Sequence, residues 1–156
     1  MLTPRMTDSS SKGPEPEGSE PSHFIMKLSV TLSADRDAVD PVVRSVMKVV
    51  RETQCASGRE DDIELALTEA LANAVVHGAK SDPSKIVECD VACDEKRGML
   101  IVVRDPGPGF DPEKIPDPLH SENIYSHHGR GIFLINQLMD EVKFHKNGTE
   151  IHMIKR

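Results

Sequence analysis

Three unlike polar residues recur at every fourth position in residues 64–80, which read ELALTEALANAVVHGAK: Glu69, Asn73 and His77. Residues four apart lie on nearly the same side of an α-helix and about 6 Å apart along its axis, so one small ligand could contact all three. An asparagine oxygen suits a Mg²⁺ ion that also takes phosphate oxygens and water. A carboxylate one turn earlier could deprotonate a hydroxyl group that attacks a phosphate. The spacing therefore predicts a phosphoryl-transfer site, although a solvated helix face would also be compatible with it.

A second candidate site follows an apolar strand, in the sequence VVRDPGPGFDP. Asp105 is placed where the strand ends, and Gly107 and Gly109 leave the backbone free to approach a ligand closely. A carboxylate accepts hydrogen bonds, which suits the amino group of adenine. A tight turn beside an aspartate would give the same pattern, so this motif is weak when taken alone.

A third candidate site is the glycine pair in HHGRGIFLINQLMD. Gly129 and Gly131 are expected where a long loop meets a helix, and the free N–H groups at a helix N-terminus attract anions such as phosphate. A glycine pair that merely starts a helix is the alternative. Neither a P-loop nor a dinucleotide-binding glycine fingerprint occurs in the sequence, so those two ways of binding nucleotides are excluded at the level of motifs.

Alternating strands and amphipathic helices are expected to position these residues. The pattern predicts a mixed α/β layer structure in which a Pro/Gly-rich connection of more than twenty residues precedes the last helix. The second helix is expected to begin with a capping box formed by Ser57 and Glu60 and to end at Gly78. The first helix has two plausible starting residues, Ser33 and Pro41. The expected elements are a strand at 24–32, helices ending near 54 and 78, strands at 85–93 and 99–105, a helix from 129, and a hairpin of 142–145 with 149–154.

Composition limits the chain to one globular domain. Its 156 residues begin with a Ser-, Pro-, Gly- and Glu-rich stretch, residues 1–22, that is expected to be a disordered tail, followed by one domain at 23–156. The net charge of −7 argues against a duplex nucleic-acid partner. No apolar run is long enough to span a membrane, and no secretory signal is visible, so the chain is expected to be cytoplasmic.

Three cysteines, an odd number in a chain with no visible secretory signal, predict reduced thiols rather than a disulfide framework. Cys89 and Cys93 would share one face of a strand. Two thiols without a companion pair are only a weak indication of zinc.

The order and separation of these motifs resemble those of the GHKL (Bergerat-fold) ATP-binding proteins. More closely, they resemble the anti-sigma factor serine kinases of the RsbW and SpoIIAB type, over about Phe24 to Arg156. The resemblance implies an α/β (α+β) two-layer sandwich, with a mixed β-sheet covered on one face by helices and a long ATP lid at 110–128. It also implies ATP and Mg²⁺ as cofactors.

The same resemblance implies a role for each candidate residue. EALANAVVHG matches the N box, DPGPGF the first glycine box and GRGIFL the second. Glu69 would be the catalytic base, Asn73 the Mg²⁺ ligand, and Asp105 the acceptor for the adenine amino group. The remaining nucleotide-binding positions would be His77 near the phosphates, Gly107 and Gly109 shaping the pocket, the backbone of Gly129, Arg130, Gly131 and Ile132 around the phosphates, and Thr149 near adenine.

The function implied is that of an ATP-binding anti-sigma regulatory factor with serine/threonine protein kinase activity. It would phosphorylate a serine of an anti-anti-sigma factor of the STAS type, bind a sigma factor and form a homodimer, without direct nucleic-acid or membrane contacts. Some relatives carry an arginine ahead of the second glycine box, where this chain has His127 and His128; Arg130 could take that role. The alternative is a nucleotide-gated protein-binding module that performs no catalysis.

Overall fold

The structure is a computed structural model that describes residues 5–6, 23–111, 113 and 127–156. Apart from Arg5 and Met6, the predicted tail at 1–22 lies outside the described residues. Most of the predicted lid at 110–128 also lies outside them. Within the described part, no helix combines the length and the apolar character that crossing a bilayer requires.

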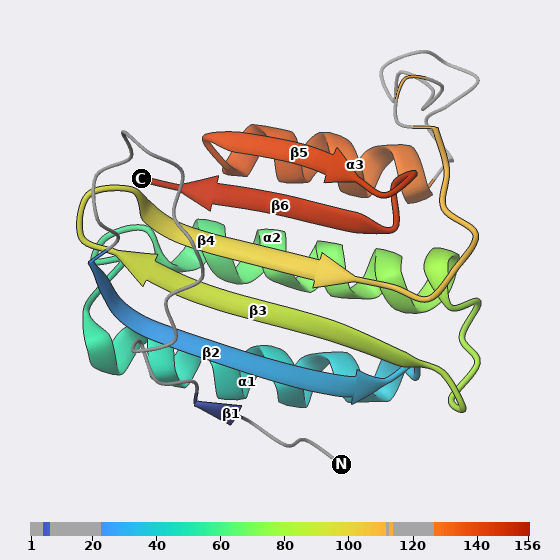
Figure 1. Cartoon of the computed structure of the whole chain (residues 1–156), viewed down its shortest axis with the longest axis horizontal. Coiled ribbons are helices and arrows are strands. Elements are labelled where there is room, and N and C mark those ends of the chain that lie inside the picture. The colour runs from blue at the N-terminus through green and yellow to red at the C-terminus, as the bar shows by residue number, and fades with distance from the viewer. Residues whose placement is uncertain (1–4, 7–22, 112, 114–126) are drawn as a thin grey trace, which may run out of the picture.

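The described chain folds into two layers, with a sheet on one side and the helices on the other (Figure 1). The sheet has six strands in the order β1-β2-β3-β4-β6-β5. The predicted two-layer α/β sandwich with helices on one face is confirmed. In chain order the elements are β1 (Arg5–Met6), β2 (Phe24–Ser33), α1 (Arg36–Thr53), α2 (Glu60–Asn73), the π-helix η1 (Ala74–Gly78), β3 (Ile86–Asp94), β4 (Gly98–Arg104), α3 (His127–Leu138), β5 (Glu141–His145) and β6 (Glu150–Lys155).

Every described strand pair is antiparallel, whereas a mixed sheet was expected. The reason is the number of helices in the connections. Between β2 and β3 the chain passes through two helices, so it reverses direction three times and β3 runs antiparallel to β2. Tight hairpins join β3 to β4 and β5 to β6, and hairpins give only antiparallel neighbours.

The core lies between the sheet and the helices. Along β2 and β3 the buried side chains alternate with exposed or half-exposed ones, as expected for strands with one covered face. Five valines and Met47 form the buried stripe of α1. The buried stripe of α2 consists of Ile63, Ala66, Leu67, Ala70 and Leu71. Fully buried side chains with large volumes include Met47, Ile63, Leu67, Leu71, Met99, Ile101, Ile135 and Met153.

Both predicted helix starts need correction. Helix α1 is capped by Asp35, whose Oδ1 accepts a hydrogen bond from the Asp37 N–H at 2.9 Å, and Pro41 lies inside the helix. Helix α2 begins after Arg59 and has no side-chain cap. The expected capping box is absent because α2 begins only at Glu60, which puts Ser57 outside the N-cap position. The Ser57 hydroxyl donates to the carbonyl oxygen of Gln54, at 3.1 Å. The end at Gly78 holds, but η1 rather than α2 reaches it.

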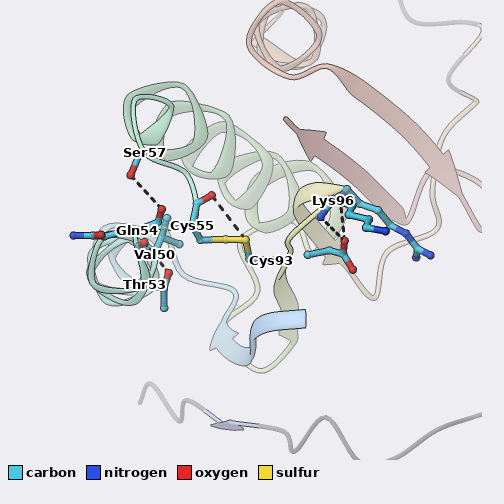
Figure 2. Close-up of a disulfide and its surroundings, with 9 residues drawn as sticks. Val50, Thr53, Gln54, Cys55, Ser57, Cys93 and Lys96 are labelled. Atoms are coloured by element: carbon cyan, nitrogen blue, oxygen red, sulfur yellow. Dashed lines mark hydrogen bonds between the residues drawn. A yellow bond between two sulfur atoms is a disulfide. The ribbon is translucent and has the colours of Figure 1, made fainter. Parts of the chain in front are cut away.

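A disulfide joins Cys55, in the connection after α1, to Cys93 near the end of β3 (Figure 2). The two cysteines are 38 positions apart in sequence, and their Cα atoms are 6.3 Å apart. The expectation of three reduced thiols is therefore wrong for this pair. The fold brings the helix connection against the inner face of β3. Cys89 remains a buried free thiol, and burial raises its pKa to about 12.

Candidate functional site

The polar row of the sequence crosses a change of helix type. Glu69 lies one turn before the end of α2, Asn73 is the final residue of α2, and His77 lies on η1. The expectation that one α-helix carries all three is therefore wrong for His77. A π-helix is wider than an α-helix, so it turns His77 to a direction that α-helical spacing does not give. Single π-turns inside helices occur frequently at functional sites.

Asp105 directly follows β4 and is held from both sides by backbone groups. Its N–H donates to the carbonyl oxygen of Thr149 at 2.9 Å, which ties it to the start of β6. The N–H of Gly107 donates to Asp105 Oδ1 at 2.8 Å. The pKa of Asp105 is raised by partial burial, against the opposing effect of the Gly107 N–H. Its oxygens are thus fixed as acceptors at the end of the strand.

Close packing joins the end of η1 to the turn after β4. A Cβ atom on Gly78 would lie 2.5 and 2.6 Å from the two carboxylate oxygens of Asp105, and one on Gly107 would collide with the Gly78 carbonyl group. Such separations leave no room for a side chain at either position. Glycine at these two places allows the N-box segment and the first glycine box to meet backbone to backbone.

The second glycine box meets the polar row in the same manner. Gly131 is buried, and a Cβ atom there would lie 2.9 Å from Asn73 Nδ2 and 3.1 Å from Glu69 Oε2. Helix α3 begins at His127, so Gly129 lies in its first turn and Gly131 and Ile132 lie in its second. The N–H groups without partners within a helix belong to its first turn. Gly129 is therefore better placed than Gly131 or Ile132 to donate to an anion.

The turn between β5 and β6 contacts Phe110, the first residue of the predicted lid. The Phe110 N–H donates to the carbonyl oxygen of Asn147 at 2.7 Å, and the Phe110 ring meets Phe144 edge-on with centroids 5.3 Å apart. Gly148 is buried, and a Cβ atom there would come within 2.9 Å of the Phe110 ring. The hairpin therefore holds the chain at Phe110, where the predicted lid begins.

These segments enclose a first cavity of about 330 Å³. Apolar side chains and glycine backbone form much of its wall, and polar groups are placed at a few points, as in small-molecule sites. The first cavity is lined by Ala70, Asn73, Ala74, His77, Gly78, Lys80, Val103, Asp105, Pro108, Gly109, Phe110, Ile132, Ile135, Phe144, Gly148, Thr149 and Ile151.

A second cavity of about 430 Å³ lies on the other side of the polar row, between α1 and α2. Asn73 and His77 line both cavities, whereas Glu69 lines only the second. The row is therefore a partition between two spaces. The second cavity is lined by Arg36, Val39, Asp40, Thr68, Glu69, Ala72, Asn73, Val76 and His77.

The fold brings most of the predicted residues together. Asn73, His77, Asp105, Gly109, Ile132 and Thr149 line the first cavity. Gly107 and Gly131 do not line this cavity, but each packs closely against a residue that does, Gly78 and Asn73 respectively. The Arg130 side chain is exposed. The side chains of His127 and His128 lie outside the described residues. The turn-forming sequence KNG at 146–148 was the signal available for Gly148. Eleven lining residues were not among the predicted site residues: Ala70, Ala74, Gly78, Lys80, Val103, Pro108, Phe110, Ile135, Phe144, Gly148 and Ile151.

The arrangement has the chemical elements of a phosphoryl-transfer site. The first cavity offers a fixed acceptor at Asp105 and apolar walls for a ring. Asn73 supplies a neutral oxygen of the kind that Mg²⁺ accepts beside phosphate oxygens. Glu69, half-exposed in the second cavity, can accept a proton from a group that approaches from that side.

Comparison with known proteins gives consistent matches. Residues 32–155 match the model of the histidine kinase-like ATPase domain. The chain is 39% identical over 112 residues to the serine-protein kinase RsbW of Staphylococcus epidermidis, an overlap covering 64% of this chain and 69% of that protein. It is 33% identical over 101 residues to the anti-sigma F factor of Clostridium acetobutylicum, covering 62% and 69% of the two chains. The serine-protein kinase RsbW of Bacillus subtilis is 33% identical over 102 residues, covering 61% and 63%.

Proposed function

The chain belongs to the histidine kinase-like ATPase family, and we propose that it is an anti-sigma regulatory factor that acts as an ATP-dependent serine/threonine protein kinase. Its substrate would be a serine of an anti-anti-sigma factor of the STAS type, and it would also bind a sigma factor. The names of its relatives support this proposal, because they include both serine-protein kinases and anti-sigma factors. We further propose that the chain forms a homodimer and that it meets these partners in the cytoplasm.

ATP would occupy the first cavity. Asp105 would accept a hydrogen bond from the adenine amino group, and Thr149 lies beside it through the backbone bond between the two residues. Asn73 would hold Mg²⁺ through its side-chain oxygen. The residue is half-exposed and lines the cavity, so the ion would have room for water and phosphate oxygens as further ligands. When bound, Mg²⁺ would supply charge neutralisation for the phosphates.

The single observation that carries the kinase proposal is the position of Glu69 relative to the two cavities. A hydroxyl group entering through the second cavity would meet Glu69 on its own side of the partition and the nucleotide on the other. Its oxygen would form a bond to the γ-phosphorus, the bond from that phosphorus to ADP would break, and the hydroxyl proton would go to Glu69. A protein that only binds nucleotide has no use for a carboxylate at this place.

The test is phosphate transfer from labelled ATP to the cognate anti-anti-sigma protein by wild type and Glu69→Ala. Removal of a general base costs about 10²- to 10⁴-fold in rate, whereas ATP affinity should stay within a few-fold because Glu69 does not line the first cavity. Glu64→Ala is the matched control on the same helix, since Glu64 pairs with Arg51 at 2.9 Å and lines neither cavity.

Persistent phosphorylation by Glu69→Ala would show that another group accepts the proton. Stable ATP without phosphoserine in the wild-type reaction would instead favour the alternative, a nucleotide-gated binding module. Calorimetric titration of MgATP into the wild-type protein tests the binding step by itself.

A further inference from the structure

Two consecutive residues after η1 have left-handed backbone conformations. Lys80 and Ser81 both have φ of 54°. For a residue with a Cβ atom this conformation is unfavourable, and glycine is the usual choice where the chain leaves a helix in this way. Glycine would satisfy the backbone at this position with less strain, but Lys146 adopts the same conformation, with φ of 52°, so the conformation alone does not explain the lysine.

The backbone geometry itself has a structural cause. The Ser81 N–H donates to the carbonyl oxygen of Val75, and the Ala79 N–H donates to that of Ala74, both at 2.8 Å. These bonds close the end of η1 and require the chain to reverse at Lys80. They involve no side-chain atom of Lys80, so they explain the backbone conformation but not the residue type.

Lys80 is one of the residues at the wall of the first cavity. It is exposed, and it lines the cavity with His77 and Asp105. Lys80 takes part in none of the ion pairs that the described part of the chain forms. In a chain with net charge −7, a lysine held at a cavity wall without such a pair is suited to an anionic ligand.

We propose that Lys80 is a further nucleotide-binding residue whose ammonium group contacts the phosphate chain of ATP in the first cavity. The inference rests on the proposed function, because it takes ATP as the ligand. The phosphates are the anionic part of that ligand, and a lysine ammonium is a compact cation with three donors. A hydrogen bond to a charged group of this kind corresponds to about a tenfold change in affinity.

The experiment measures the affinities of MgATP and adenosine calorimetrically for Lys80→Met, Lys80→Gly and Ser81→Gly. Lys80→Met removes the charge and keeps the length of the side chain, so it should weaken MgATP binding about tenfold and leave adenosine unchanged. Lys80→Gly should lose the same affinity while keeping or raising the Tm of the nucleotide-free protein, because glycine tolerates the left-handed conformation. Lys80→Arg retains the charge and should retain most of the affinity.

Ser81→Gly is the matched control. It makes the same backbone change one residue later, outside the residues that line the first cavity, and should alter neither affinity. The inference is overturned if Lys80→Met binds MgATP as tightly as wild type, or if it loses adenosine affinity to the same extent as MgATP affinity. A wild-type protein that binds no MgATP would overturn the proposed function together with it.

Discussion

The two ends of helix α2 are built in opposite ways. At the N-terminal end, the connection from α1 is joined covalently to β3 by the Cys55–Cys93 disulfide, and Ala56 is buried beside it. At the C-terminal end the helix passes into η1, and three glycines pack where a Cβ atom would collide with neighbouring groups: Gly78, Gly107 and Gly131. The first end restricts the chain by a cross-link. The second restricts it by close backbone approach, which keeps the polar row accessible to ligands.

Anchoring and ligand contact are thus separated along one rigid element, helix α2. Helix α2 has 14 residues, so its ends are about 20 Å apart. Changes at the disulfide end should therefore act on folding stability and spare the site. Changes at the glycine end should act on the site and have less effect on stability.

The largest expected effect is on stability, from loss of the disulfide. A cross-link closing a loop of 38 residues stabilises by about 4 kcal/mol in the chain-entropy model. Reduction by a dithiol, or the substitution Cys55→Ala, should lower the free energy of unfolding by about that amount and leave MgATP affinity unchanged. Urea denaturation with and without reductant measures the effect.

Cys89→Ala is the control for the disulfide, because Cys89 is buried in the same strand but is not cross-linked. The variant should remain sensitive to reductant, whereas Cys55→Ala should be insensitive. If reduction weakened MgATP binding as strongly as it weakened folding, the two ends of α2 would not be separable.

The next effect is expected at the glycine end, from Gly131→Ala. The added methyl group would displace the Asn73 amide and the Glu69 carboxylate, and misplacement of catalytic groups by about 1 Å can cost about 100-fold in rate. Folding should survive because both displaced groups are ends of flexible side chains and alanine favours the helix. Phosphotransfer rates and thermal denaturation of the same preparation measure the two quantities.

Gln137→Ala serves as the control for Gly131→Ala, since Gln137 is an exposed residue of the same helix that lines neither cavity. A normal transfer rate in Gly131→Ala would show that the contact between α3 and the polar row is not needed for positioning.

The smallest effect concerns acid stability near the hairpin of β5 and β6. The hydrogen bond from His152 lowers the pKa of Glu150 to about 2 from 4.5, helped by Lys146 and Arg104 and opposed by burial. A lowered carboxyl pKa gives stability that is present above about pH 4.5 and is lost as the pH falls towards 2. The loss should be on the order of 1 kcal/mol, because the cationic partners are partly exposed.

Urea denaturation between pH 2 and 6 measures this contribution as the difference in the free energy of unfolding between wild type and Glu150→Gln. The variant should be less stable at pH 6, and the difference should shrink as the pH falls. A constant difference across that range would mean that the ionisation of Glu150 does not contribute.

The sequence was sufficient for the strands and for the placement of Glu69 and Asn73 on one helix, for a physical reason. Side-chain burial repeats every second residue in a strand and about every fourth in a helix, and β2, β3 and Glu69–Asn73 follow these periods. The π-turn that carries His77 has no such signature, because periodicity does not reveal one inserted residue. The pairing of Cys55 with Cys93 depends on tertiary proximity, which the spacing of cysteines does not contain.

Site residues could be predicted where they belong to one local sequence motif. They were missed where the cavity wall is assembled from segments far apart in the sequence. Asp105 and Gly109 follow directly from a strand that ends in a glycine-rich turn. Phe144 and Ile151 could not be assigned to the first cavity, because their contribution depends on where the last hairpin lies in the sheet. The second cavity was missed for the same reason, since it forms between two helices. The roles of the site residues stay predictions.

The place of β6 between β4 and β5 has a consequence for synthesis. The lining of the first cavity extends along the chain from Ala70 to Ile151, so it cannot be complete until β6 has left the ribosomal exit tunnel. A nascent chain that stops short of β6 exposes one edge of β4 and has no finished pocket through which ATP could stabilise it. Until that moment the nucleotide cannot stabilise the growing polypeptide, and the open edge of β4 is available for pairing with other chains.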